Sequence, residues 1–194
     1  MRILRNLIVA VLMTLVTTVI FGLGYPLMVT GLAQWLFPAQ ANGSLIVRDG
    51  RLIGSRLLGQ PFSAAIYFHS RPSAAGPAGY DATASGGTNL GPTSKALIDA
   101  VRDRVTLARK DDPGAPVPVD LVTSSGSGLD PDLSPAAALF QVARVAKARG
   151  ADAAAVRQLV EAHIEARQLG FLGEPRVNVL ELNLALDAQF PVRH

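Results

Sequence analysis

Residues 7–23 read LIVAVLMTLVTTVIFGL, and this run decides how the rest of the chain is organised. A helix needs roughly 20 predominantly apolar residues to cross about 30 Å of hydrocarbon. No Asp, Glu, Lys, Arg or His occurs from Asn6 to Val47, so the apolar stretch extends well past the run. The sequence therefore predicts a membrane-spanning helix and its outer extension over residues 7–37, bent near Pro26.

A cleaved secretory signal is the alternative interpretation of this stretch. Arg2 and Arg5 would form its positive region, and Ala39-Gln40-Ala41 resembles a cleavage site. The apolar region of a signal is about 7–15 residues long, and this one is about twice that length. We therefore expect a retained anchor, with release of the chain after Ala41 as the alternative.

The distribution of charge predicts the orientation of the anchor. Arg2 and Arg5 precede the span, and the next positive residue is Arg48. The positive-inside rule then places residues 1–6 in the cytoplasm and residues 38–194 outside it, in the periplasm if the membrane is a bacterial inner membrane. We expect Tyr25 and Trp35 near the outer interface.

Charge and cysteine content narrow the classes of function. The chain has 18 Lys and Arg against 15 Asp and Glu, or 16 against 15 without Arg2 and Arg5, so the outer domain is near neutral. No basic cluster interleaved with aromatic residues appears, which argues against a nucleic-acid partner. The absence of cysteine excludes disulfides, zinc–thiolate sites and thiol catalysis.

In the first half of the outer domain, the sequence predicts a hairpin, two further strands, a helix and two loops. Asp49-Gly50 between apolar runs is a strong hairpin signal, because both residues tolerate positive φ. The other predicted elements are a short strand at 66–69, a loop over 70–92, a helix from Thr93 or Ser94 to 109, a strand at 117–123 and a Gly/Ser loop at 124–133.

In the second half of the outer domain, the sequence predicts helices. Ser134-Pro135 and Asp152 are good helix starts, and we expect helices from there to Gly150 and to Leu169. Residues 177–186 alternate as a strand does but have the Leu and Ala content of a helix, and we predict a helix. Strands and helices without regular alternation make an α+β domain.

Candidate chemical sites are incomplete. The loop Ser124–Gly128 could cradle a phosphate with its backbone N–H groups, but no Gly-Lys-Ser/Thr follows it. Glu161, His163 and Glu165 form the densest group of possible metal ligands, although the histidine would point away from the two carboxylates on a helix. We predict no catalytic set and no metal site.

Five ordered motifs nevertheless resemble the C subunit of the Kdp potassium-transporting P-type ATPase, and the likeness covers nearly the whole chain. The motifs are YFHSRPSA (67–74), SGGTNLGP (85–92), DLVTSSGSGLDP (120–131), QVARVA (141–146) and LGEPRVNVL (172–180). The chain departs from the family pattern at Asp132-Leu133, where His-Ile is expected.

The resemblance implies a non-catalytic accessory subunit in a complex of four. Its partners would be a channel-like potassium-binding subunit, the catalytic P-type ATPase subunit and a small single-span subunit. The family is described as an assembly factor and as a catalytic chaperone that raises the ATP affinity of the catalytic subunit, so ATP is a possible ligand here. The competing hypotheses are a membrane-anchored periplasmic enzyme and a binding module.

The two Gly-rich loops are our candidates for contact with a partner, as a rigid cap over the outer mouth of the pore subunit. Glycine permits backbone shapes that other residues resist, which preorganises such a surface. The candidate interface residues are Arg71, Ser85, Gly86, Gly87, Asn89, Gly128 and Asp130. The candidate nucleotide-binding residues are Ser124, Ser125, Gly126, Ser127 and Gly128.

Overall fold

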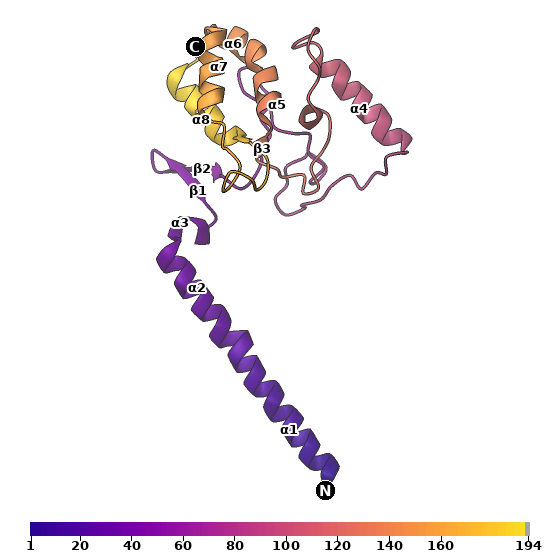
Figure 1. Ribbon diagram of the computed structural model, residues 1–194, viewed down its shortest axis with the longest axis vertical. Helices are drawn as coiled ribbons and strands as arrows, with labels where there is room; N and C mark the ends of the chain where they lie inside the picture. The colour runs from indigo at the N-terminus through magenta and orange to yellow at the C-terminus, as the bar shows by residue number, and fades with distance from the viewer. Residues whose placement is uncertain (193–194) are drawn as a thin grey trace. The chain divides into compact units, whose positions relative to one another are not determined.

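The computed structural model describes residues 1–192, and contacts along the chain divide it into two units, Met1–Ser55 and Arg56–His194. The first unit holds the apolar helix and a hairpin. The second is a small body of helices and short strands (Figure 1). The predicted α+β class with one N-terminal apolar helix is confirmed.

The apolar stretch is helical from Arg2 to Leu36, and an 18-residue window within it has a mean hydropathy of 2.5 and no buried part. It comprises α1 (Arg2–Thr17), the π-helical segment η1 (Thr18–Gly24) and α2 (Tyr25–Leu36). The wider turn lies just before Pro26, where the N–H of Tyr25 reaches the carbonyl of Ile20. Proline has no N–H to donate, and π-turns are a common way to absorb such a break in the hydrogen-bond pattern.

The hairpin follows the four-residue helix α3 (Pro38–Ala41). Strand β1 (Leu45–Arg48) pairs antiparallel with β2 (Arg51–Ser55). The turn residues Asp49 and Gly50 have φ of 52° and 73°, as a type I′ turn requires. The predicted hairpin is therefore confirmed.

The core of the second unit lies among four helices, α5 (Pro135–Phe140), α6 (Val142–Arg149), α7 (Ala153–Ala162) and α8 (Val179–Gln189). The short antiparallel pair of β3 (Asp132–Leu133) and β4 (Val177–Asn178) contacts α5 through β3 and α8 through β4. Fully buried side chains from these helices and from the segment around residue 68 meet there, among them Phe68, Val145, Val156, Leu182 and Leu186.

Side-chain caps begin three of these helices, α5, α7 and α8. The Ser134 hydroxyl accepts from the Ala137 N–H, and the Asp152 carboxylate accepts from the Ala155 N–H. Both starts match the prediction. Residues 177–186 were predicted as helix, and the structure makes their first two residues β4 and the rest part of α8.

Two predicted helix lengths are wrong. The helix expected from Ser134 to Gly150 is broken at Gln141, whose side chain bonds the backbone of His69 instead of lying on a continuous helix surface. The helix expected to reach Leu169 ends at Ala162, and the His163 ring caps it through the Leu159 carbonyl at 2.8 Å.

Two predicted strands are also wrong. Residues 66–69 belong to none of the strands in the described part of the chain. Residues 117–123 contain the 3-10 turn η2 (Val119–Leu121), with the Thr123 N–H bonded to the Val119 carbonyl. Pro118 explains the second error, because it has no N–H for a strand ladder.

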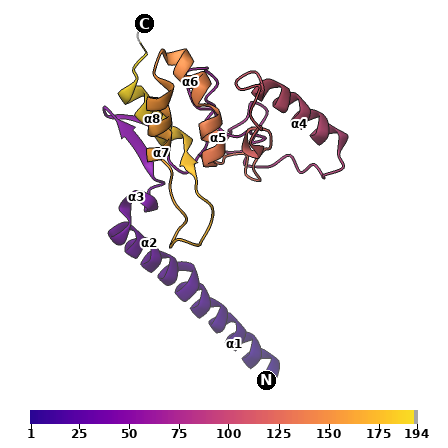
Figure 2. The ribbon, with the colours of Figure 1, turned by 45° about the horizontal axis from the view of Figure 1, so that its top comes forward.

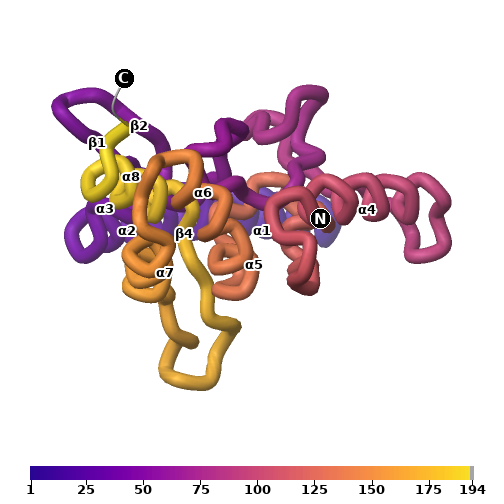
Figure 3. The backbone as a smooth tube through the Cα atoms, turned by 90° about the horizontal axis from the view of Figure 1, so that it is seen from above, coloured from indigo at the N-terminus to yellow at the C-terminus, as the bar shows by residue number. Residues whose placement is uncertain are grey.

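Helix α4 (Lys95–Ala108) lies where it was predicted, with Ser94 at its N-terminus. It has no buried residue, and it lies apart from α5–α8 in all three ribbon and tube views (Figures 1, 2 and 3). Its apolar stripe is only partly covered by the surrounding loops. The loop predicted over 70–92 is likewise irregular throughout.

Candidate functional site

The two Gly-rich loops, residues 85–92 and 124–132, are in contact, and we call them the paired loops. The N–H of Gly86 donates to the Ser127 carbonyl at 2.8 Å, and the Ser85 hydroxyl donates to the same oxygen at 3.1 Å. Gly87 is equally close, because a Cβ there would lie 3.1 Å from the Gly126 carbonyl oxygen. The loops far apart in sequence thus form one surface.

Gly128 holds this contact together. Its φ is 67°, and a Cβ on it would lie 2.7 Å from both the Ala75 nitrogen and the Gly86 oxygen. The Ser73 hydroxyl donates to the Gly128 carbonyl at 2.6 Å, and the same hydroxyl accepts the N–H of Tyr80 at 2.8 Å. Only glycine combines the backbone conformation with this close approach.

An open pocket of about 600 Å³ lies beside the loop that carries Gly128. Arg71 lines it and pairs with Asp130 at 3.0 Å. Two polar atoms of the lining, the Arg71 Nε and the Ser124 Oγ, are buried without a hydrogen-bond partner in the described chain. The lining residues are Leu57, Leu58, Arg71, Ser85, Ser124, Ser125, Gly126, Ser127, Leu129, Asp130 and Pro131.

Most predicted site residues therefore come together. Arg71, Ser85, Gly86, Gly87, Gly128 and Asp130 lie at or around the paired-loop contact or line its pocket. Asn89 does not: it is exposed, has φ of 53° and is absent from the pocket lining.

The backbone of the Ser124–Gly128 loop is partly occupied by internal bonds. The Gly128 N–H donates to the Ser125 carbonyl at 3.3 Å, and the Leu129 N–H donates to the Ser127 hydroxyl at 3.1 Å. The next helix, α5, starts only at Pro135, so no helix N-terminus follows the loop directly. Arg71 is the one cationic residue in the pocket lining.

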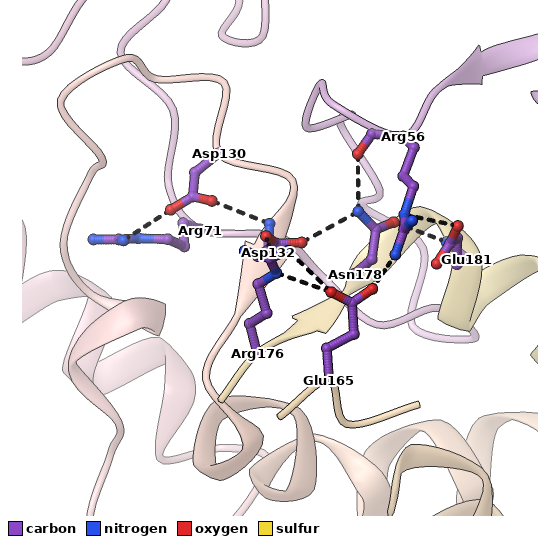
Figure 4. A network of polar contacts seen from close by, with 8 residues as sticks. All are labelled: Arg56, Arg71, Asp130, Asp132, Glu165, Arg176, Asn178 and Glu181. Atoms are coloured by element: carbon purple, nitrogen blue, oxygen red, sulfur yellow. Dashed lines mark hydrogen bonds and ion pairs between the residues drawn. The ribbon is translucent and has the colours of Figure 1, made fainter. Parts of the chain in front are cut away.

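A polar network around Asn178 was not predicted (Figure 4). Arg176 lies between Asp132 and Glu165, at 3.2 and 3.0 Å, and Arg56 pairs with both Glu165 and Glu181. Arg56 and Glu181 gave no signal in the sequence, and Glu165 was considered only as a possible metal ligand, since its pairing with Arg56 spans more than 100 residues. Arg176 stood inside a recognised motif without a role, and Asp132 was noted only as a departure from the family pattern.

Asn178 joins this network to the fold. Its amide nitrogen donates to the Arg56 carbonyl at 2.9 Å and to Asp132 at 3.2 Å, while its oxygen caps α8 through the Glu181 N–H. Burial raises the pKa of the Asp132 carboxyl above its ordinary value, against the opposing effects of Arg176 and Asn178. The network therefore fixes β3, β4 and the end of the second paired loop to one another.

The three residues considered as possible metal ligands, Glu161, His163 and Glu165, do not lie on one helix, because α7 ends at Ala162. Glu165 lies beyond the helix and pairs with arginines, and the His163 ring is bonded to the backbone. Within residues 1–192, no three His, Cys, Asp or Glu side chains are grouped so that they could hold a metal ion.

Comparison with known proteins now decides the family. Residues 7–188 match the family described as "K+-transporting ATPase, c chain". This chain belongs to that family. The match includes the apolar helix, the paired loops and the polar network, so the fold described above is that of a C chain.

Curated relatives of similar length carry the same description. The "Potassium-transporting ATPase KdpC subunit" of Koribacter versatilis is 60% identical over 97% of both chains. The protein of the same name from Acidobacterium capsulatum is 62% identical over 95% of this chain and 98% of its own. The one from Rhodospirillum rubrum is 56% identical over 98% and 100%.

Proposed function

We propose that this chain is a non-catalytic accessory subunit of a potassium-transporting ATPase, and that its paired loops cap the outer mouth of the potassium-binding subunit. The observation that carries the proposal is the contact fixed by Gly128. Loops already held in one shape lose little conformational entropy when a partner binds, which favours tight association. The family supports the transport complex as the setting.

The proposal extends to the other subunits named by the resemblance, the catalytic P-type subunit and a small single-span subunit. This chain would be needed for their assembly and would raise the affinity of the catalytic subunit for ATP. With residues 38–194 outside the cytoplasm, such an effect has to pass through the membrane-spanning parts of the complex. In this arrangement cytoplasmic ATP has no direct path to the domain, so a nucleotide site on the domain itself would be an alternative to this proposal.

The proposed location is the bacterial inner membrane, with residues 1–6 in the cytoplasm, 7–37 in the membrane and its outer extension, and 38–194 in the periplasm. The absence of cysteine makes this directly testable. In Arg109→Cys the new thiol lies at the exposed end of α4, and a membrane-impermeant maleimide should label it in intact spheroplasts. A thiol in Ile3→Cys, near the N-terminal end of the anchor, should be labelled only after lysis. Labelling of Ile3→Cys in intact spheroplasts and of Arg109→Cys only after lysis would refute the orientation.

The cap is tested at Gly86. A Cβ at Gly86 would have only the Ala84 oxygen nearby, at 4.0 Å, so Gly86→Val alters the surface and leaves the loop contact in place. We expect reduced co-purification with a tagged potassium-binding subunit. Gly114→Val, on an exposed turn with the nearest atom at 3.9 Å, is the matched control. Intact complexes with normal potassium affinity in Gly86→Val would refute the cap.

A nucleotide is a second candidate ligand, at the pocket lined by Ser124–Ser127, next to Gly128. The presence of Arg71 in the lining favours it, because a guanidinium is well suited to phosphate oxygens. Calorimetry on the purified chain should then show saturable ATP binding that weakens in Arg71→Gln. A chain that shows no saturable binding would remove this candidate.

A further inference from the structure

Between α7 and β4 the chain runs out and back as a hairpin-like arm, residues 165–176, which reaches away from α5–α8 (Figures 2 and 3). Its base is closed by two backbone bonds between Glu165 and Arg176, of 2.8 and 3.0 Å. Two more, both 2.9 Å, join Gln168 and Leu172 near the tip. The arm is therefore a defined structure with paired sides.

The tip of the arm is apolar and exposed. The side chains of Leu169, Phe171 and Leu172 are exposed to 83%, 69% and 48%. No charged residue occurs from Gln168 to Gly173. A group of large apolar side chains on a projecting tip costs solubility, and such groups commonly mark interaction sites.

The tip is also held in a strained shape. Leu169 has φ of 53°, which is unfavourable for a residue with a Cβ. The turn is kept by bonds from the Gly170 N–H to the Arg167 carbonyl, at 3.1 Å, and from the Phe171 N–H to the Gln168 carbonyl, at 3.2 Å. A fixed shape is useful for fitting a pocket of matching shape.

The charges along the arm are paired. Arg176 is bonded to Glu165 and Asp132, and Arg167 pairs with Glu174. Lipid-binding surfaces usually offer free cations to anionic headgroups, and a fluid bilayer accepts apolar area of any shape. Neutral flanks and a strained, fixed turn favour a protein groove over a lipid surface.

We propose that the tip of the arm inserts into an apolar groove on another subunit of the same ATPase, with Phe171 as the central anchor. This rests on the proposed role as an accessory subunit but concerns a surface separate from the paired loops. Aromatic anchors that fill a pocket dominate the affinity of protein interfaces. The polar network at the base, through Arg176, Glu165 and Arg56, holds the arm on the body.

The test uses the full chain co-expressed with the other subunits. The double variant Leu169→Asn with Phe171→Ser removes apolar area, and Asn tolerates the positive φ at its position, so the arm keeps its shape. We expect recovery in the tagged complex to fall about tenfold or more, with unchanged thermal unfolding of the isolated chain. Leu107→Ser, which removes a similarly exposed leucine from α4, should leave recovery unchanged.

A photoreactive phenylalanine analogue at position 171 identifies the occupant. In the assembled complex, a cross-link to another subunit of the ATPase supports the proposal. Cross-links only to lipid or to a second copy of this chain, or none, would overturn it, as would normal recovery of the double variant. If the double variant is recovered normally while the Gly86→Val chain is lost from the complex, the arm proposal is refuted and the proposed cap is not. The opposite pattern refutes the cap and supports the arm.

Discussion

At the scale of single residues, two buried amides support an extended segment that was predicted to be a strand. Asn183, only 1% exposed, accepts the Phe68 N–H and donates to the Phe68 carbonyl, both at 2.9 Å. The Gln141 amide likewise accepts the His69 N–H at 2.8 Å and donates to the His69 carbonyl at 3.1 Å. Arg144 and Arg149 donate hydrogen bonds to the backbone carbonyls of residues 65–67, just before Phe68 in the chain. Side chains thus satisfy a backbone that would otherwise need a neighbouring strand.

Replacing Asn183 by leucine should therefore be costly. Asn183→Leu leaves the N–H and the carbonyl of Phe68 buried and unpaired, and we expect the free energy of unfolding to fall by roughly 2–4 kcal/mol. Urea unfolding followed by circular dichroism measures it, because the single tryptophan, Trp35, lies outside this unit. Gln189→Leu, on the exposed end of the same helix, is the control. Equal stability of the two variants would contradict the role of Asn183.

His69 makes the stability of this unit dependent on pH. Burial, and then the nearby Arg144 charge, lower the pKa of its imidazole below the ordinary 6.5. The unfolded chain then binds this proton more readily than the folded chain, so the free energy of unfolding should decrease as the pH falls below about 6.5. Unfolding at pH 7.5 and 5.5 should show a smaller decrease in His69→Gln than in the natural chain. The same decrease in both would exclude His69 as the cause.

At the scale of elements, local signals set where helices and turns begin, and a distant partner accompanies the break inside one predicted helix. Ser134, Asp152 and the Asp49-Gly50 turn lie where they were predicted. At the break at Gln141, its side chain bonds to His69, 72 residues away, and this contact is not visible in the helix sequence itself.

The paired loops behave as one element, and Gly128 is the place to test this. Gly128→Ala puts a Cβ within 2.7 Å of two backbone atoms at a φ of 67°, so we expect a loss of roughly 2–4 kcal/mol in the free energy of unfolding. Gly126→Ala, two residues earlier, meets no atom within 4 Å and should be neutral. A destabilisation of similar size in both variants would mean that the contact between the loops is not the cause.

At the scale of the whole molecule, an apolar helix and a folded unit of near-neutral charge share one chain. The helix has the length and composition to cross a membrane, and its Thr14 and Thr17 hydroxyls bond to carbonyls within the helix, as an apolar surrounding requires. The family adds that the chain works as a subunit of a larger transporter. The paired loops and the arm, which are left open on the folded unit, are the surfaces where we propose that partners bind.

The retained anchor is the prediction that belongs to this scale. We expect the chain to fractionate with membranes after alkaline extraction and its mass to include the sequence from Met1 or Arg2. A version that begins at Asn42 should be recovered in the soluble fraction. A natural chain whose mass starts at Asn42 would instead establish a cleaved signal.

The sequence by itself determined the apolar helix, the hairpin, the helix starts, the α+β class and the family, because these follow from local patterns and ordered motifs. It also identified most of the paired-loop residues, since glycine-rich runs are conspicuous. Only the tertiary structure decided that Gly128 closes the loop contact, that residues 66–69 are held by Asn183 and Gln141, and that Arg176 and Arg56 support an exposed arm. Each depends on groups tens of residues or more apart, and no local pattern records which distant side chain will meet a given backbone.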